Sequence, residues 1–513
     1  MSDTSVLGTL DIIVLVAYFG ALFAMGFSFA RKNTSTEQYF LGGRRFSGWV
    51  IGLSLVGTSI SSVTFLAYPG DAFRTAWLRF LPNLMLPVAV LVAAYFFLPF
   101  FRRGNTTTAY EFLEERFGPS IRVYGAVTFI VGQIVRVSLI LYLISLVLQE
   151  VTGLDAAWCV VIGGGVVAVY TIMGGIEAVI WTDVIQTIVL LLGGIVCFAV
   201  IVDALPGGIE QLIRVAMADG KLAFAELRDG SLHEVGWNLS LFDKTASMML
   251  LVGLVLFLTE YSSNQNTVQR FCASKSDADA RQAMFICAAV SVPTWAFFMC
   301  LGTALYVFFQ VFPTVAAEEM LQGARKAEEI LPYFVAHYLP SGLVGLVIAA
   351  ALAAAMSSLD SSINAISTVS IHDMYRRFAR VERPDRHYLR VARIIAALVS
   401  LIMGCGALLL LATETKTLQD TATILLSLLA GGLLSIYLIG FFSTRGDARH
   451  ILCGIAGTML FTAWTILSAR ALVPEAFSFP FDLYYAGFLG NLVMFLVAFG
   501  LSFFWLAPAK GKS

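Results

Sequence analysis

The stretch Ala349-Ala-Ala-Leu-Ala-Ala-Ala-Met-Ser-Ser-Leu-Asp-Ser-Ser-Ile-Asn-Ala-Ile-Ser367 decides how this chain is built. It begins as small apolar residues inside a long hydrophobic segment and turns polar at Ser357. Ser357, Asp360 and Ser361 are spaced i, i+3 and i+4, so a helix places them on one face. A carboxylate at membrane depth is costly and is expected to have a partner or a function.

Two interpretations of this polar face stay open from the stretch itself. Hydroxyl and carboxylate oxygens beside closely packed alanines suit a hard monovalent cation such as Na+. The alternative is a serine-rich helix whose hydroxyls bond to their own carbonyls while Asp360 pairs with an arginine.

The composition is that of a membrane protein. Of the 513 residues, 58% are hydrophobic and 13% are charged, and the mean hydropathy is +0.82. These values predict an all-α polytopic membrane protein that lies in a lipid bilayer. The net charge of −1 argues against nucleic acid as a partner. There is no C-x-x-C pair, H-E-x-x-H, G-x-S-x-G or Walker A motif, so we expect neither an enzyme nor a zinc site.

Apolar runs of about 20 residues predict about thirteen membrane-spanning segments. They lie near residues 8–30, 47–70, 79–101, 122–149, 156–173, 178–202, 243–263, 282–310, 341–371, 388–412, 419–442, 449–470 and 483–507. Two longer loops, at about 203–242 and 311–340, are expected to carry short surface helices or to act as lids.

Basic residues are concentrated in alternate loops of one parity. Arg44, Arg102, Arg116, Arg270 and Arg376 are examples, and the loops of the other parity hold few. The positive-inside rule then places the N-terminus outside and the C-terminus in the cytoplasm, which requires an odd number of spans. We expect a multi-pass protein of the cell membrane (the inner or plasma membrane).

The second predicted span combines glycine and hydroxyl residues in the middle of an apolar segment. Its sequence is Gly52-Leu-Ser-Leu-Val-Gly-Thr-Ser-Ile-Ser-Ser-Val-Thr64, with Gly57 near mid-span. Gly lowers the cost of unwinding a helix, and Ser and Thr satisfy the backbone groups that unwinding frees. We predict a broken helix whose free carbonyls are available to cations; a serine-rich packing helix is the alternative.

Three other polar residues lie in or at the ends of apolar segments. Arg136 is the only basic residue deep in its span, and needs an anion: either a substrate carboxylate or a protein carboxylate such as Asp360 or Glu260. Asp183 opens the sixth span, where a helix N-terminus favours an acidic residue. Tyr261 ends the seventh span as an interfacial anchor or a gate.

Several of these motifs resemble those of the sodium/solute symporters, and most closely the bacterial sodium-coupled sialic acid carriers among them. The resemblance rests on the stretch 349–371 and on four further motifs. These are Tyr39-Phe-Leu-Gly-Gly-Arg44, Thr108-Ala-Tyr-Glu-Phe-Leu-Glu-Glu-Arg-Phe117, Gly174-Gly-Ile-Glu-Ala-Val-Ile-Trp-Thr-Asp-Val-Ile-Gln186 and Asn264-Gln-Asn-Thr-Val-Gln-Arg270.

The resemblance implies one transporter domain over residues 1–513 with a LeuT-type core of two inverted five-helix repeats. The repeats would be residues 47–202 and 243–442, with an extra N-terminal helix at 8–30 and peripheral helices at 449–507. Substrate and ions would meet near the midplane, where the first helix of each repeat is broken.

The resemblance also implies the ion ligands. The first Na+ site would use the carbonyls of Gly57, Ile60 and Ala354 and the hydroxyls of Ser357 and Ser358. A possible second Na+ site would use Asp183, Ser357, Asp360 and Ser361. The sialic acid carriers have Ser where this chain has Asp360.

For the substrate, the resemblance implies that Arg136 binds a carboxylate. Ser61, Thr64, Asn83, Arg79 and Tyr261 would be further contacts, with Tyr261 as an inner gate. Asn83 and Arg79 replace a Gln and an aromatic residue of the sialic acid carriers. The implied function is Na+-coupled import of a carboxylated sugar such as sialic acid, with Na+ and the solute as ligands and no obligate protein partner.

The alternatives are a Na+ symporter for a neutral sugar, an amino acid or a vitamin. A sensor or a channel derived from a transporter is a third possibility from a different class.

Overall fold

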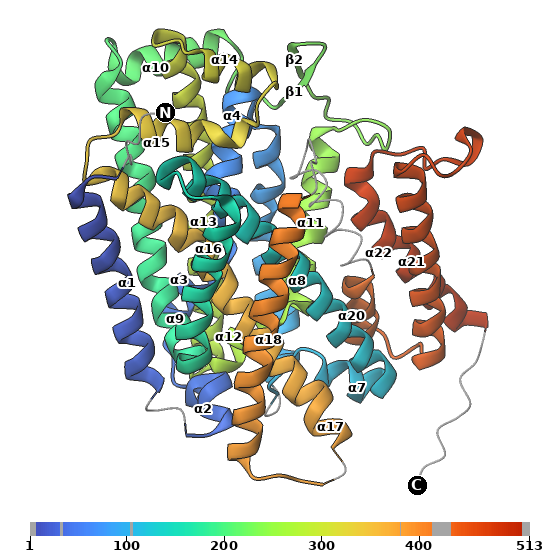
Figure 1. The fold of residues 1–513 in the computed structure, drawn as a ribbon. Coiled ribbons are helices and arrows are strands. Elements are labelled where there is room, and N and C mark those ends of the chain that lie inside the picture. The colour runs from blue at the N-terminus through green and yellow to red at the C-terminus, as the bar shows by residue number, and fades with distance from the viewer. Residues whose placement is uncertain (1–6, 31–33, 103–105, 380, 413–431, 505–513) are drawn as a thin grey trace, which may run out of the picture.

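A bundle of long helices makes up the chain, as Figure 1 shows. The computed structural model describes residues 7–30, 34–102, 106–379, 381–412 and 432–504. Ten of the described helices are long and apolar enough to cross a membrane, and a bent pair of helices gives one further span. The fold is therefore that of an α-helical multi-pass membrane protein.

The straight helices lie where the apolar runs predict them. They are α1 (Thr9–Ala30), α8 (Pro119–Thr152), α11 (Ala246–Ser263), α13 (Asp277–Val311), α16 (Leu343–Val369), α18 (Asp385–Ala412), α21 (Ala448–Ala469) and α22 (Ala486–Phe504). A span near 77–102 is assembled from η3 (Trp77–Met85), α5 (Leu86–Val92), η4 (Ala93–Phe97) and α6 (Leu98–Arg102). Of the segment predicted at 419–442, the structure describes only α20 (Leu433–Phe442), and residues 413–431 lie outside the described residues.

Helix α9 (Ala156–Ala204) holds two predicted spans in one element. Its 49 residues contain one non-helical position, Gly175, with φ 60° and ψ −161°. A straight helix of this length would be about 74 Å long, more than twice the hydrocarbon thickness. Gly is required at 175 because a Cβ there would lie 2.8 Å from the carbonyl oxygen of Tyr39. The break lies between the predicted segments 156–173 and 178–202.

The ion-site stretch forms the centre of the bundle. Almost every residue of α16 is buried, and the helix packs along α9, α8 and α1. A Cβ added at Gly193 of α9 would lie 2.3 Å from the Cβ of Ala350, so the small residues bring these two backbones together. The predicted role of the alanine run as a close-packing surface is confirmed.

The N-terminal helix α1 is fixed to the start of α16 by Asp11. The Asp11 carboxylate accepts hydrogen bonds from the amides of Gly342 (2.7 Å) and Gly345 (2.6 Å). These amides have no carbonyl partner at a helix N-terminus, and the carboxylate supplies one. Helix α1 is thus a support for the long polar helix.

Short elements cover the two ends of the bundle. At one end lie α2 (Thr36–Leu41), α7 (Glu111–Phe117), α12 (Gln265–Ala273), η6 (Ser370–Tyr375) and α17 (Arg376–Phe378). At the other end lie α10 (Gly208–Ala218), α14 (Val315–Gln322), η5 (Ala327–Glu329) and α15 (Ile330–Tyr338). The prediction of short helices in these two longer loops is confirmed. Helix α1 begins at the end that carries α10, and α22 ends at the opposite end (Figure 1).

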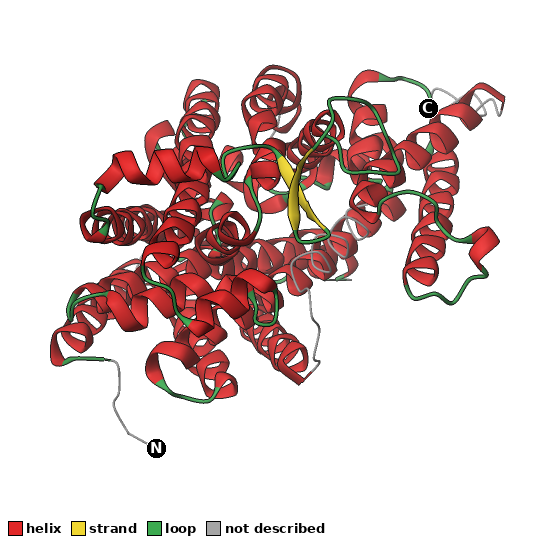
Figure 2. Ribbon diagram, turned by 90° about the horizontal axis from the view of Figure 1, so that it is seen from above, coloured by secondary structure: helices red, strands yellow, loops and turns green. Residues whose placement is uncertain are grey.

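One element in these loops was not predicted. Strands β1 (Ala225–Arg228) and β2 (Ser231–Glu234) form an antiparallel hairpin in which Ala225 pairs with Glu234. Asp229 and Gly230 form the turn, with φ values of 49° and 78°, and Asp-Gly is a strong signal for this turn. Figure 2 shows the hairpin over the middle of this face, with α21 and α22 to one side.

Candidate functional site

The second span is broken, as its sequence predicts. Helix α3 (Gly48–Ser59) ends at Ile60, which is extended with φ −100° and ψ 101°. The chain resumes in η2 (Val63–Ala67) and α4 (Tyr68–Arg74), and the two parts are bent by 59°. The amide of Thr64, the usual partner of the Ile60 carbonyl, bonds to the Ser61 carbonyl instead (2.9 Å). The break therefore frees backbone oxygen at mid-span.

Helix α16 places its hydroxyls against this break. The Ser357 hydroxyl donates to the Gly57 carbonyl at 2.9 Å and lies 3.3 Å from the Ala354 carbonyl. The Ser358 hydroxyl is buried and has no hydrogen-bond partner within the described part of the chain. The structure thus gathers the carbonyls of Gly57 and Ala354 and the hydroxyl of Ser357 at one buried position, an oxygen set suited to Na+.

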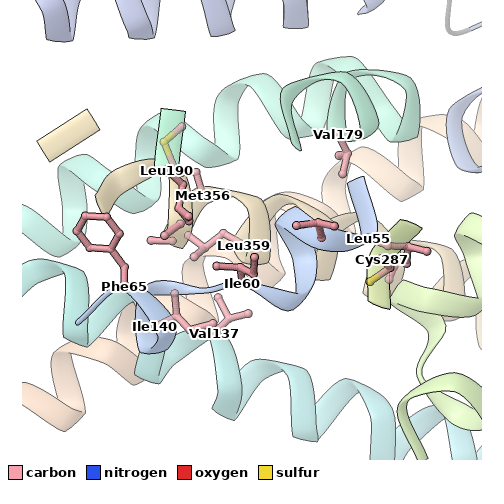
Figure 3. Close-up of a cluster of buried hydrophobic side chains, with 14 of the residues drawn as sticks. Leu55, Ile60, Phe65, Val137, Ile140, Val179, Leu190, Cys287, Met356 and Leu359 are labelled. Atoms are coloured by element: carbon pink, nitrogen blue, oxygen red, sulfur yellow. The ribbon is translucent and has the colours of Figure 1, made fainter. Parts of the chain in front are cut away.

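Apolar side chains surround Ile60 at the break. Figure 3 shows Ile60 with Met356 and Leu359 of α16 on one side and Val137 and Ile140 of α8 on the other. In apolar surroundings an oxygen atom that has neither a cation nor a hydrogen-bond donor as its partner is costly.

Arg270 is a buried cation of the site, and its place in the sequence did not predict this. Its guanidinium donates to Asp183 Oδ2 (2.7 Å), to Ser361 Oγ (2.7 Å) and to Ser54 Oγ (2.8 Å). Its side chain is 1% exposed, in helix α12, so its assignment to a basic loop was wrong. One signal was present: the ten residues from Asn264 to Ala273 carry a single charge, which is low for a solvated loop.

The remaining carboxylates near α16 are taken by neighbours within the protein. Asp183 lies inside α9 and forms an ion pair with Arg270, in place of the helix-terminal role considered for it. Asp360 Oδ2 accepts from the hydroxyls of Tyr170 (2.8 Å) and Thr182 (3.3 Å). Arg270 therefore lies between two residues of the predicted second ion site, Asp183 and Ser361, and a cation there requires this side chain to move.

We expect Arg270→Met to destabilise the protein strongly. Removing one partner of a buried ion pair leaves an uncompensated charge and costs about 3–5 kcal/mol. Thermal unfolding of the purified protein in detergent measures the loss. The double variant Arg270→Met with Asp183→Asn removes both charges and is expected to regain much of the stability; no recovery would show that the pair is not what holds these helices.

Arg136 has no partner among the described residues. It lies half-buried in α8 and makes neither a hydrogen bond nor an ion pair with any of them. Glu260, one protein carboxylate considered for it, accepts from Asn264 (2.6 Å) and Thr267 (2.7 Å) instead. Asp360, the other, is held by Tyr170 and Thr182. Arg136 was expected to pair with either a substrate carboxylate or a protein carboxylate, and no protein carboxylate pairs with it among the described residues.

The other predicted substrate residues fall into two groups. Ser61 and Thr64 are buried at the break, and their hydroxyls make no hydrogen bond to another described side chain. The Asn83 amide donates to the Tyr68 hydroxyl at 2.9 Å, and Arg79 forms an ion pair with Asp71. These contacts fix η3 to the outer half of the broken span.

Tyr261 lies apart from these residues. It is buried at the end of α11, where its ring stacks on Phe271 with a centroid distance of 6.0 Å. Phe271 belongs to α12, one of the elements at the end opposite the hairpin. The structure places Tyr261 on the far side of the break from the residues that line the outer cavity.

A large cavity opens on the hairpin side of the break. Its volume is about 860 Å³, and its lining includes Leu66, Asp71, Arg79 and Leu143 of α8. Leu143 lies seven residues after Arg136, two helical turns or about 10 Å further out on the same face. The cavity is of the size that holds a small organic ligand.

Comparisons with known proteins agree with this arrangement. The chain matches the sodium:solute symporter family over residues 39–457. The sodium/sialic acid symporter NanT of Aliivibrio fischeri is 30% identical over 96% of this chain and 92% of NanT. SiaT of Proteus mirabilis, also a sodium/sialic acid symporter, is 29% identical over 99% of this chain and 97% of SiaT.

A solved structure shows the same fold. A Na+-coupled sialic acid symporter in a substrate-bound, outward-open state superimposes with a TM-score of 0.87 at 28% identity, covering 98% of this chain and 99% of that one. The broken span, the oxygen-lined position on α16 and these matches together lead to one assignment. The chain belongs to the sodium:solute symporter family, and Na+ is its coupling ion.

Proposed function

We propose that this protein imports a carboxylated sugar such as sialic acid together with Na+, by alternating access and without chemical change to the solute. The observation that carries the proposal is the guanidinium of Arg136, which has no counter-ion among the described residues. Leu143, two helical turns further along α8, lines the outer cavity. A carboxylate of the solute supplies that counter-ion. Relatives named as sialic acid symporters support the same choice of solute.

The first Na+ is assigned to the position between the broken span and α16. Its ligands are the carbonyls of Gly57, Ile60 and Ala354 and the hydroxyls of Ser357 and Ser358. The Na+ joins two elements that otherwise meet through the Ser357 to Gly57 hydrogen bond. Binding of the ion favours the conformation in which these oxygens converge.

Ion and solute are coupled through adjacent residues of the break. Ile60 contributes to the ion position, and Ser61, the next residue, begins the segment that faces the solute with Thr64. Fixing the Ile60 carbonyl therefore also fixes the direction of the Ser61 hydroxyl. Each ligand then strengthens binding of the other, typically by about 1–3 kcal/mol.

On the side of η3, the proposed pocket offers polar groups other than a carboxylate-binding cation. Asn83 and the Arg79–Asp71 ion pair present an amide and a charged pair to the hydroxyl and N-acetyl groups of the sugar. Tyr261, deep on the opposite side, acts as the inner gate. These roles follow from position relative to the break.

A second cation position is assigned to Asp183, Asp360 and Ser361 with Ser357. Arg270 contacts two of these residues, so the ion and the guanidinium alternate there. Movement of Arg270 in the transport cycle would make the second position available. The number of Na+ ions per solute therefore depends on where this side chain rests.

The proposed membrane arrangement has thirteen spans, with the N-terminus outside and the C-terminus in the cytoplasm. Two inverted repeats, residues 47–202 and 243–442, form the core. The break in the first helix of the first repeat and the opposite positions of the start of α1 and the end of α22 support this arrangement.

Binding to the purified protein tests the choice of solute. We expect titration calorimetry with N-acetylneuraminate to show saturable binding in Na+ and much weaker binding when K+ replaces Na+. Glucose, proline and biotin serve as neutral-sugar, amino-acid and vitamin controls. Na+-dependent binding of one of these, with none of the sugar acid, would refute the proposal.

A further inference from the structure

The outer cavity contains basic side chains that the protein does not neutralise. Three acidic residues of its wall are in ion pairs: Asp71 with Arg79, Glu226 with Lys244 at 3.3 Å, and Glu329 with Arg325 at 2.8 Å. Two basic residues of the wall are left, Arg74 and Lys326. Neither has a carboxylate within ion-pair distance among the described residues.

Arg74 is fixed in place but lacks an acceptor. It ends α4, the outer half of the broken span, and its Nε is sealed from solvent without a hydrogen-bond partner in the described ranges. Its guanidinium lies against Gly323, where an added Cβ would be 2.4 Å from Nη2. A buried donor without an acceptor is costly, so an anion that binds at this guanidinium is favoured.

Lys326 lies three residues after Gly323, on the same wall of the cavity. Its Nζ donates to the Tyr142 hydroxyl at 2.8 Å, and this leaves other ammonium protons to donate. Tyr142 precedes Leu143, which stands two turns outward of Arg136 on α8. The two cations thus lie further out than Arg136, on the way from the hairpin side.

Glu328 is the remaining acidic residue of this wall. The next residue, Glu329, is the carboxylate that pairs with Arg325. Glu328 itself forms no ion pair with Arg74 or Lys326 in the described chain. Burial raises the pKa of the Glu328 carboxyl above its ordinary value.

We propose that Arg74 and Lys326 form an outer carboxylate-binding subsite that captures the acidic solute before it reaches Arg136. The inference rests on the proposed function, because it needs a solute with a carboxylate. A basic subsite at the mouth of a cavity raises the rate of capture of an anion, and salt screens the effect. It should therefore act on KM at low ionic strength and leave the maximal rate unchanged.

The test is Na+-driven uptake of labelled N-acetylneuraminate by proteoliposomes that carry Arg74→Gln, Lys326→Met or both. At low ionic strength and fixed Na+, we expect each single variant to raise KM about three- to tenfold with an unchanged maximal rate. Choline chloride added to about 0.3 M should remove most of the difference, since charges more than a few ångströms apart are then screened. Arg74→Lys keeps the charge and should recover most of the uptake.

Arg325→Gln is the matched control, because it removes one positive charge from the same wall but one that is already paired with Glu329. A KM effect as large in this control as in Arg74→Gln would overturn the subsite, as would a loss confined to the maximal rate. If the unaltered protein takes up no sugar acid, the proposed function and this inference both fail. If it does and the variants match the control, only the subsite fails.

Discussion

Arg136→Gln is expected to abolish uptake of the sugar acid at micromolar concentrations. Truncating one partner of a buried charge pair costs about 2–5 kcal/mol, which corresponds to a loss of affinity of about 30- to 4,000-fold. The loss should be large because the proposed function gives the carboxylate no other cation at the broken span, where Arg270 is already paired with Asp183. Equilibrium binding and initial uptake rates measure it.

Two controls separate this role from a general defect. Arg136→Lys keeps the charge but lacks the two parallel donors of a guanidinium, so it should bind with intermediate affinity. Stabilisation of Arg136→Gln by Na+ alone should persist, because Arg136 is not an ion ligand. Unchanged affinity for the sugar acid in Arg136→Gln would show that Arg136 does not bind the carboxylate.

Ser357→Ala is expected to raise the Na+ concentration for half-maximal uptake at least about tenfold. The variant removes one of the ligands assigned to the ion and also the hydrogen bond to Gly57. Changes outside the set of direct ligands commonly cost 10- to 100-fold in metal affinity, and a direct ligand should cost no less. Na+ titrations of initial uptake at saturating solute measure the shift.

Ser362→Ala is the matched control on the same helix. Its hydroxyl donates to Gln133 Oε1 at 3.0 Å and lies outside the assigned ion ligands. Its half-maximal Na+ concentration should stay within about twofold of the unaltered protein, as a lost neutral hydrogen bond costs only about 0.5–1.5 kcal/mol and acts on packing rather than on the ion. Equal shifts of the half-maximal Na+ concentration in the two variants would show that Ser357 is not a ligand of the ion.

Hydropathy and glycine content predicted much of the architecture. The apolar runs located most helices because a spanning helix needs a minimum length of apolar residues. The break near Gly57 was predictable because glycine and hydroxyl residues inside an apolar run have few other uses. Gly175 ends one long helix and begins another between two predicted spans, because only glycine tolerates its backbone conformation.

What the sequence did not predict depends on contacts between distant segments. Arg270 looked like a loop residue because its burial comes from α3, α9 and α16 packing around it. The same is true of Arg79, whose charge is balanced by Asp71 only once η3 folds against α4. The burial of Arg74 likewise depends on its contact with Gly323, which is distant in the sequence.

The role of α1 also emerged only from the structure. The resemblance implied an extra N-terminal helix, and nothing in its sequence linked Asp11 to the ion-site helix. In the fold the Asp11 carboxylate caps the start of α16, and the Tyr18 hydroxyl lies 3.9 Å from the sulfur of Met356. Helix α1 therefore holds the helix whose hydroxyls meet the broken span.

The central claim is that Na+ drives import of a sugar acid, and one measurement tests it most directly. Labelled N-acetylneuraminate is presented to proteoliposomes with an inward Na+ gradient, and in parallel with K+ in place of Na+. We predict uptake above the equilibrium level with the Na+ gradient and none above leakage with K+. Equal uptake in the two conditions, or none in either, would contradict the claim.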